Sequence, residues 1–406
     1  MKTLKILRIV LIGLAVLLIA YFGSMYFLTG RSFEYLYRTT VWMESDIYDF
    51  QRFPSREIQN AGTVFTFDQN PMPERFQRIT FTEWGSDQPQ ETDFEALMTQ
   101  TGTTGFLVIQ DDAILYENYF NGFQRDSIFT SFSSAKSFDS TMIGIAIDQG
   151  LIGSLDDPVI RYIPELEGRG IDNLTIRHLV TMSSGIAYTE AELYPFIFSP
   201  VSDDALTYYY PDLRWIALDR VRAGEEPIGE YFHYNNYHPI LEGMILKRVT
   251  GMPVTQYLQE KIWKPLGMEY PGSWSLDSEQ SSFEKMESGI NARAIDYAKF
   301  GRLFLNNGNW NGQQIISEEW VREATTPDPN DQRKQVTANT PNGYYKYHWW
   351  GQTQPDGTYD FFAAGHLGQF IFVSPDKNAI IVRLGDEKGP QVYWPDLMAQ
   401  IADDLP

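Results

Sequence analysis

The sequence predicts an α+β fold with three parts: an antiparallel sheet flanked by helices, a mainly helical lobe, and one transmembrane helix at the N-terminus. Two strand pairs, at 105–120 and 369–384, lie near opposite ends of the chain that follows residue 90. Antiparallel strands at both ends of a domain, with helices between them, imply that the two ends meet in one sheet. An uncharged run at 9–28 precedes this domain and is long enough to cross a bilayer.

The uncharged run is the first predicted element. Lys2, Lys5 and Arg8 precede it, so the positive-inside rule keeps the start of the chain in the cytoplasm and places the remainder outside. A cleaved signal peptide is the alternative, although its apolar region is normally shorter and ends at small residues. Aromatic residues at the far end are typical of an interfacial belt and favour an uncleaved anchor: Tyr21, Phe22, Tyr26 and Phe27.

The distribution of apolar, polar and proline residues divides the chain into three segments. Residues 1–30 are the membrane anchor, residues 31–90 a juxtamembrane extension, and residues 91–406 the main domain. The extension is polar and aromatic with scattered prolines, so we expect it to pack loosely on the main domain. Hydrophobic residues make up 43% of the 406-residue chain, which predicts a well-packed core.

The strand pairs are predicted from apolar runs on either side of a turn. Asp111 and Asp112 separate the two runs of the first pair, and Pro375 to Asn378 separate those of the second. The C-terminal segment 392–403 is predicted to be a helix that covers the sheet.

Helical patterns fill the stretch between the strand pairs. Phe138, Met142 and Ile145 form an apolar stripe that ends at Gly150, a residue typical of helix ends. About residues 151–290 should form a helical lobe that provides the second wall of a cleft. Further helices are predicted from Asn236 to Gly251, from Pro253 to Pro265, along the stripe Tyr297, Phe300 and Phe304 to Gly308, and after the cap residue Ser317.

Charge and composition exclude several classes of function. The net charge is −21, from 53 acidic and 32 basic residues, and such a surface repels phosphate, so we expect no nucleic-acid partner. The chain has no cysteine, which excludes disulfides, thiolate metal sites and a cysteine nucleophile. His233 and His238 lack the spacing of a zinc-protease helix, so we expect no metal and no cofactor.

The strongest candidate for chemistry is Ser133-Ser134-Ala135-Lys136, at the start of the helix that contains Phe138. Residues three apart on a helix share one face, so the Ser133 hydroxyl and the Lys136 amine should be neighbours. The N-terminus of a helix also offers unpaired N–H groups and the positive end of its dipole. A lysine that burial keeps neutral can assist a serine nucleophile. The same residues are also compatible with a serine-rich helix cap beside a solvated lysine.

Two weaker motifs follow along the chain. Tyr234 and Asn236 come just before a helix, where a tyrosine near a lysine can act as a base and an asparagine can hydrogen-bond both the lysine and a substrate amide. His366, Gly368 and Gln369 enter an apolar strand, and the glycine would let a substrate backbone approach the strand edge. Taken alone, each motif is equally typical of an ordinary turn.

The order S-x-x-K, Y-x-N and H-x-G, on a helix start, a loop and a strand, resembles the β-lactamase class C and D,D-peptidase superfamily of penicillin-recognising serine hydrolases. The similarity covers about residues 102–405 and includes the segments 155–165, 176–185 and 263–268. Residues 131–138 are most similar to the 6-aminohexanoate-dimer hydrolase and carboxylesterase branch.

This resemblance implies a β-lactamase/transpeptidase-like fold and a role for each motif. Ser133 would be the nucleophile, Lys136 would assist its deprotonation, and Tyr234 would be the general acid/base. The backbone N–H groups of Ser133 and Gln369 would form the oxyanion hole. His366 stands where the family often has lysine, which argues against recognition of a substrate carboxylate. The candidate substrate-binding residues are Asn236, His366, Gly368, Gln369 and Tyr188.

The function expected from the sequence is hydrolysis of a small-molecule amide or ester, through an acyl-enzyme on Ser133. A D,D-carboxypeptidase or β-lactamase is an alternative that differs in substrate, and a non-catalytic, membrane-attached binding module is an alternative that keeps only the fold. No G-x-S-x-G elbow is present, which disfavours an α/β-hydrolase. Four aromatic residues are candidates for apolar contact in the cleft, although core packing is the more typical role of the two tryptophans: Tyr188, Tyr237, Trp349 and Trp350. The oligomeric state is not predicted.

Overall fold

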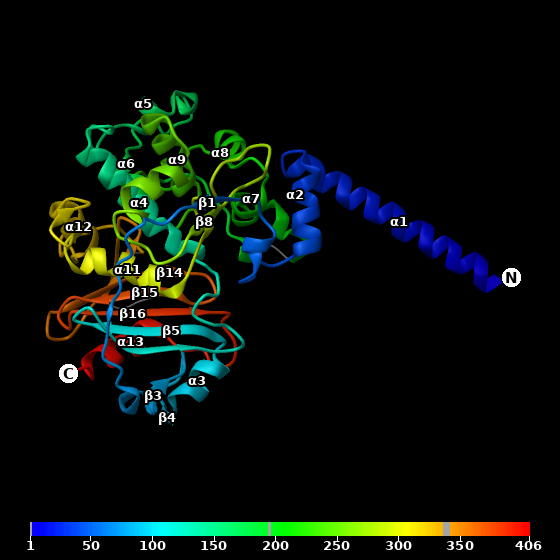
Figure 1. The fold of residues 1–406 in the computed structure, drawn as a ribbon. Helices are drawn as coiled ribbons and strands as arrows, with labels where there is room; N and C mark the ends of the chain where they lie inside the picture. Colours follow the sequence, from blue (N-terminus) through cyan, green and yellow to red (C-terminus); the bar gives the residue numbers. More distant parts are fainter. Residues whose placement is uncertain (1, 194–195, 336–341) are drawn as a thin grey trace.

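The computed structural model describes residues 2–193, 196–335 and 342–406. Figure 1 shows a central sheet with the helical lobe on one side and α13 and α3 on the other, while the long helix α1 projects from the lobe side. The α+β architecture expected from the sequence is confirmed.

The central sheet has eight strands in the order β12-β13-β14-β15-β16-β5-β6-β2. The two predicted strand pairs are β5–β6 and β15–β16, and β16 pairs antiparallel with β5, so the two ends of the domain do meet in one sheet. Asp111 and Asp112 have φ of 52° and 62°, the left-handed conformation that a two-residue hairpin turn needs. The strands are β2 (Asp68–Gln69), β5 (Thr103–Gln110), β6 (Ala113–Tyr119), β12 (Gly343–Lys346), β13 (Trp349–Thr353), β14 (Tyr359–Gly365), β15 (Gln369–Ser374) and β16 (Ala379–Gly385).

Both faces of this sheet are buried, because successive side chains of a strand point to opposite faces. In β5, Leu107 and Ile109 join the core under the helical lobe, whereas Phe106 and Val108 join a second core. The second core also contains residues of α3 (Phe94–Gln100), α13 (Trp394–Asp403) and the hairpin β3–β4 (Arg78–Thr82, Pro89–Asp93). The predicted C-terminal helix therefore covers the sheet as expected.

The predicted helices between the strand pairs are present. Ser317 caps α12 by accepting a hydrogen bond from the Trp320 N–H, and Gly251 ends α9 with φ 71°. The helices are α4 (Ala135–Asp148), α5 (Val159–Tyr162), α6 (Ile176–Val180), α7 (Asp203–Tyr209), α8 (Leu213–Arg220), α9 (Tyr237–Thr250), α10 (Val254–Leu258) continued by the π-turn η8 (Gln259–Trp263), α11 (Ala294–Leu305) and α12 (Glu318–Thr325). Short 3-10 turns are η2 (Asp49–Gln51), η3 (Pro73–Phe76), η4 (Phe132–Ser134), η5 (Pro164–Leu166), η6 (Ala191–Leu193) and η7 (Phe196–Val201).

A smaller sheet crosses between the helical lobe and the central sheet. Its strand order is β1-β8-β9-β7, and all of its pairs are antiparallel. The strands are β1 (Ser55–Ile58), β7 (Phe129–Thr130), β8 (Gly272–Ser275) and β9 (Ile290–Ala292), and a separate two-stranded hairpin is formed by β10 (Asn309–Trp310) and β11 (Gln313–Gln314). Because β7 leads directly into η4 and α4, this small sheet fixes the position of Ser133.

The N-terminal helix α1 (Lys2–Leu28) contains a segment that could cross a membrane by length and composition. Lys5–Leu28 has a mean hydropathy of 2.5. Most of its described side chains are exposed, for example Ile19 at 73%, but Met25 at 2% and Thr29 just beyond the helix at 0% are buried against the main domain. The end of the apolar helix is therefore part of the folded structure.

Residues 31–54, here called the connecting segment, pack tightly against the helical lobe, so the expectation of loose packing is wrong. The segment contains α2 (Phe33–Tyr37) and the π-turn η1 (Arg38–Trp42). The Tyr35 hydroxyl donates a hydrogen bond to the Pro200 carbonyl at 2.5 Å, and the Arg38 guanidinium donates one to the Tyr209 carbonyl at 3.0 Å. Tyr35 is 0% exposed and Arg38 is 2% exposed, so this contact is an internal part of the domain.

One buried histidine of the helical lobe predicts how stability depends on pH. His238 in α9 is 0% exposed, and its Nε2 lies 2.6 Å from the Ser184 hydroxyl. Burial lowers the pKa of His238 well below its usual value of 6.5. In the unfolded chain the imidazole takes up a proton below about pH 6.5, whereas in the folded protein it stays neutral. The contribution of His238 to the free energy of unfolding is therefore fully present above pH 6.5, and it is lost as the pH falls toward the pKa of the folded state.

We expect thermal unfolding to show this loss. His238 contributes up to about 2 kcal/mol of destabilisation between pH 6.5 and 5. Replacing it with glutamine, which can still hydrogen-bond Ser184, should flatten that part of the profile. Above about pH 7.5 the imidazole is neutral in both states, so the difference between the two proteins should then stay constant. An equal slope in both proteins below pH 6.5 would contradict the assignment.

Candidate active site

The turn before α4 brings Ser133 to the surface of a cavity. Phe132 has a φ of 43°, an uncommon value for a bulky residue, and this sharp turn presents the half-buried Ser133 at the start of α4. Gly365 at the end of β14 packs directly under the turn, where an added Cβ would lie 2.2 Å from the Ser131 carbonyl oxygen. The absence of a side chain at Gly365 therefore lets the sheet approach the turn closely.

Lys136 contacts Ser133 as the i, i+3 spacing predicts. The Lys136 Nζ donates hydrogen bonds to the Ser133 Oγ at 2.8 Å and to the Glu287 carbonyl oxygen at 2.9 Å. Its side chain is 1% exposed, so the amine lies under the surface with two fixed acceptors. This arrangement holds the amine of Lys136 against the hydroxyl of Ser133. Lys136 is therefore not the solvated lysine of the alternative interpretation.

Tyr234 is the third member of this group. Lys136 Nζ lies 4.8 Å from the centroid of the Tyr234 ring. The ring stacks on Trp350 with a centroid distance of 6.1 Å and an interplanar angle of 21°, and the edge of Tyr345 packs against it at 6.2 Å. The structure therefore brings Tyr234 beside Ser133 and Lys136, which lie about a hundred residues earlier in the sequence.

A buried polar network lies behind Tyr234 and ties its neighbours to the core. The Tyr345 hydroxyl lies 3.0 Å from His348 Nδ1, and His348 Nε2 lies 2.9 Å from a carboxylate oxygen of Glu242 in α9. Asp139 in α4 is fully buried beside Glu242. Burial, followed by the negative charge of Glu242, raises the pKa of Asp139 well above its usual range and so favours the neutral acid. This network locks α4, α9 and β12–β13 together around the tyrosine.

Asn236 reaches the site in a different way from the one expected. Its side-chain Nδ2 donates to the Tyr188 hydroxyl at 3.0 Å, and Tyr188 donates in turn to the Asp204 carboxylate at 2.6 Å. No hydrogen bond from Asn236 to Lys136 is present among the described residues, so that expected contact is not formed. Asn236 lines the cavity, whereas Tyr188 is 9% exposed and lies behind it.

His366 and Gly368 lie in the turn between β14 and β15, and Gln369 is the first residue of β15. His366 lines the cavity, and its ring meets the edge of Phe132 at 5.5 Å. The surrounding cavity walls lower the pKa of His366 through desolvation, so the ring is neutral at pH 7. Gly368 has φ 79°, and an added Cβ would lie 2.0 Å from the guanidinium of Arg383, so the turn and this packing require glycine there. The Gln369 side chain is held by Gly385, with its amide donating to that carbonyl at 2.6 Å.

Three of the site residues line one cavity of about 1130 Å³. They are Ser133, Asn236 and His366, and more of the cavity surface is apolar than polar. A second part of the wall comes from α1, the connecting segment and α7, which were not expected near the site. The sequence gives no local sign of this, because these segments are distant along the chain.

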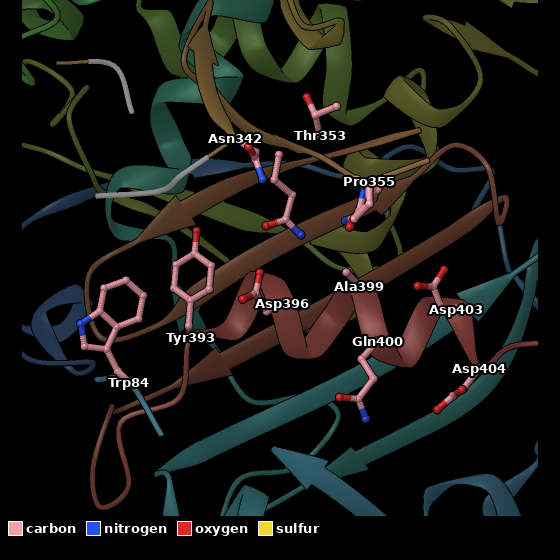
Figure 2. A pocket seen from close by; sticks show the side chains of 12 residues that line it. Trp84, Asn342, Thr353, Pro355, Tyr393, Asp396, Ala399, Gln400, Asp403 and Asp404 are labelled. Carbon is pink, nitrogen blue, oxygen red and sulfur yellow. The ribbon is translucent and has the colours of Figure 1, made fainter. Parts of the chain in front are cut away.

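A second cavity, of about 580 Å³, lies on the other side of the sheet (Figure 2). Figure 2 shows Asp396, Ala399 and Asp403 along α13 facing this space, with Tyr393 and Trp84 at one side. Its described lining residues include no serine and no lysine, so they do not reproduce the Ser133–Lys136 pair. Within the described residues no group of three or more histidine, aspartate or glutamate side chains could hold a metal ion.

The aromatic candidates separate into two groups. Trp350 stacks on Tyr234 and so lies beside the site. Trp349 is 0% exposed and stacks on Phe300 in the core, and Tyr237 is also 0% exposed.

Sequence reasoning missed Glu287, whose backbone carbonyl oxygen accepts a hydrogen bond from Lys136. A backbone acceptor cannot be recognised from the residue type.

The fold and the order of these groups match one known family. A family model described as beta-lactamase matches residues 91–404, most of the chain. The chain belongs to the beta-lactamase family. It is therefore an enzyme of the serine hydrolase type, as the sequence predicted.

Relatives within this family have several named activities. The chain is 28% identical to a 6-aminohexanoate-dimer hydrolase of Paenarthrobacter ureafaciens over 77% of this chain and 80% of the relative. It is 27% identical to the esterase EstB of Burkholderia gladioli over 39% of this chain and 41% of that one. The solved structure of a 6-aminohexanoate-dimer hydrolase homologue from Bacillus anthracis has a TM-score of 0.70 at 21% identity, covering 87% of this chain and 90% of that one. That likeness supports the beta-lactamase/transpeptidase fold.

Proposed function

We propose that this beta-lactamase-family protein hydrolyses neutral or cationic esters or linear amides through an acyl-enzyme on Ser133. The observation that carries the proposal is the contact between Ser133 and the buried amine of Lys136, with Tyr234 against the same amine. A hydroxyl next to a shielded base and a second proton carrier is the arrangement that nucleophilic acyl transfer needs.

The proposed reaction has two halves. In the first, the Ser133 oxygen bonds to the substrate carbonyl carbon while its proton passes through Lys136 and Tyr234 to the leaving group. The bond from the carbonyl carbon to the leaving oxygen or nitrogen then breaks. In the second half, water attacks the acyl-enzyme, gives its proton to the same pair, and releases the acid as Ser133 regains a proton. We assign the oxyanion hole to the backbone N–H groups of Ser133 and Gln369.

Asn236 and Tyr188 have distinct proposed roles. Because the Tyr188 hydroxyl donates to Asp204, its oxygen can accept the Asn236 N–H, which fixes the orientation of the amide. Asn236 Oδ1 is buried and has no hydrogen-bond partner among the described residues, so it is an acceptor left over for a substrate N–H or O–H. Asn236 is therefore proposed to contact substrate, and Tyr188 to position Asn236.

The walls of the cavity favour substrates without a negative charge. Glu44, Glu192, Asp204 and Glu287 line it, and no lysine or arginine is present among its described lining residues. His366 is neutral at pH 7 because burial lowers its pKa, so it offers no fixed cation to a carboxylate. These features support an esterase or amidase over the D,D-carboxypeptidase or β-lactamase alternative. The Ser133–Lys136 contact in turn argues against a non-catalytic binding module.

The N-terminal helix is proposed to be an uncleaved membrane anchor with the catalytic domain outside the cytoplasm. Its length and hydropathy support a membrane span, and its basic start supports the orientation. The burial of Met25 and Thr29 in the main domain supports retention, since removal of the helix would expose the surface beneath them.

A comparison of two substrate classes tests the proposed specificity. Full-length protein in detergent micelles should hydrolyse a butanoyl nitrophenyl ester with a kcat/KM at least about tenfold above that for a chromogenic cephalosporin, which carries a carboxylate. A tenfold ratio corresponds to about 1.4 kcal/mol of transition-state binding. Preference for the cephalosporin would restore the β-lactamase alternative, and turnover of neither compound would support a different substrate class or a binding module.

A further inference from the structure

We propose that the substrate is a membrane-resident amphiphile, an ester or amide whose hydrocarbon chain enters the active site along α1. This inference rests on the proposed acyl-enzyme function at Ser133 and names the substrate class of that site. The short ester or amide is then the polar end of a longer molecule that stays in the bilayer.

The first observation is that one face of α1 forms a wall of the Ser133 cavity. Leu18, Tyr21, Phe22 and Met25 line it, and residues three and four apart lie on one face of a helix. Of these four, Met25 is 2% exposed, Tyr21 and Phe22 are half-buried, and Leu18 at the outer end is 56% exposed. Ile19, which does not line the cavity, is 73% exposed. Figure 1 shows α2 and α7 beside the base of α1, and both contribute to the same cavity.

The second observation is the size and chemistry of this space. A cavity of about 1130 Å³ exceeds the usual range of about 300–1,000 Å³ for small-ligand sites. A butanoyl group would leave most of it filled with water in contact with apolar side chains. A long hydrocarbon chain would instead cover that apolar surface, and each buried methylene would add about 0.8 kcal/mol to the hydrophobic transfer free energy.

The third observation is the position along α1 of the residues that line the cavity. Leu18 precedes Leu28 by ten residues, which is about 15 Å along a helix. This is about half of the 30 Å hydrocarbon thickness of a bilayer. If α1 crosses the membrane, the wall that it gives to the cavity therefore lies at the depth of the lipid chains in the outer leaflet.

The connecting segment independently marks this side as facing lipid. Phe33, Tyr37 and Val41 recur at intervals of four residues and are 74%, 55% and 56% exposed. Met43, which lines the cavity, is 54% exposed. Large apolar side chains on one face of a helical segment next to a membrane span are typical of an interfacial helix. The mouth of the cavity is thus bordered by the two elements that would contact the bilayer.

The polar end of the substrate is placed by the same cavity. The scissile carbonyl must reach Ser133, and the acidic side chains nearby favour a neutral or cationic head. On attack, the leaving alcohol or amine departs with the proton of Ser133, and the acyl chain remains in the apolar part of the cavity. Water then releases it as a fatty acid, which can return to the bilayer.

A cavity-filling variant tests the chain site in full-length protein reconstituted in phosphatidylcholine nanodiscs. Ala205 in α7 lines the cavity, so Ala205→Trp should block part of the space for the chain. The readout is the ratio of kcat/KM for a dodecanoyl ester to that for the butanoyl ester of the same alcohol. We expect Ala205→Trp to lower this ratio at least tenfold relative to the wild type.

A matched variant separates blocking from a general effect of tryptophan. Ala223 is exposed and does not line the cavity, so Ala223→Trp should keep the wild-type ratio. An unchanged ratio in Ala205→Trp, with both esters hydrolysed by the wild type, would overturn the chain site and leave the proposed hydrolase intact. Failure of the wild type to hydrolyse either ester would overturn the proposed function itself.

A second measurement does not depend on the folding of a variant. An alkyl fluorophosphonate with a photoactivatable diazirine at the end of a dodecyl chain would bond to Ser133 and then cross-link to whatever surrounds the chain. Cross-links in residues 18–25 or 36–43 are the expected result. Labelling of Ser133 with cross-links only outside these segments would contradict the proposed path.

Discussion

Ser133→Ala should abolish covalent labelling by a fluorophosphonate and lower kcat for ester hydrolysis by at least about 10³-fold. The alanine lacks the oxygen that forms the acyl bond, so only substrate binding and oxyanion stabilisation remain. The fold should be unaffected, because Ser133 is half-buried and its hydroxyl contacts Lys136 alone among the described hydrogen bonds. The measurements are gel detection of the probe, steady-state hydrolysis and thermal unfolding.

The neighbouring serine provides the control. Ser134 is 2% exposed, and its hydroxyl lies 3.5 Å from the Gln369 carbonyl. Ser134→Ala should keep probe labelling, which would locate the reactive hydroxyl at 133 rather than at the next residue. If Ser133→Ala still turns over ester with the wild-type kcat, serine acylation at this position is removed from the mechanism.

Lys136→Met should lower the rate constant for probe labelling by about 10³-fold, within the usual range for loss of a general base. Methionine preserves much of the side-chain volume but removes the amine that lies 2.8 Å from Ser133 Oγ. The stability cost should be about 1–3 kcal/mol, since the Glu287 carbonyl loses its donor. Labelling kinetics and thermal unfolding of the same samples separate the two effects.

A second buried lysine serves as the comparison. Lys299 in α11 is 0% exposed, donates to the Gly267 carbonyl at 3.0 Å, and pairs with Asp296 at 3.4 Å. Lys299→Met should cost about 3–5 kcal/mol, because it leaves Asp296 buried without its cation, yet labelling of the folded fraction should continue at the wild-type rate. Equal loss of labelling in both variants would indicate that Lys136 acts only through the fold.

The sequence was sufficient to predict those features that depend on local patterns. The apolar runs of β5 and β16 predicted one shared sheet, and the glycines after α4 and α9 predicted the helix ends. The Ser133–Lys136 contact followed from spacing on one helix. Tyr234 could be placed beside them only through the resemblance to a family, because nothing in its own surroundings specifies a contact about a hundred residues away.

The contacts of the N-terminal region could not be predicted in this way. Tyr35 binds the Pro200 carbonyl and Arg38 binds the Tyr209 carbonyl, 165 and 171 residues away. Any residue can supply a carbonyl, so the acceptors have no signature in the sequence. The composition of residues 31–90, polar and aromatic with scattered prolines, is also typical of an irregular surface segment. For the same reason the sequence did not indicate that α1 reaches the active site.

If α1 is the membrane anchor proposed above, the tight docking of the connecting segment determines how far from the membrane the enzyme can work. A flexible linker of the same length would let the domain sample a wide range of heights, with a span that grows as the square root of its length. Here the Tyr35 and Arg38 contacts remove that slack, so Ser133, the proposed nucleophile, would stay at a nearly fixed distance from the proposed anchor. A polymer held well away from the bilayer would be out of range, whereas molecules diffusing laterally in the membrane would be presented at a constant height.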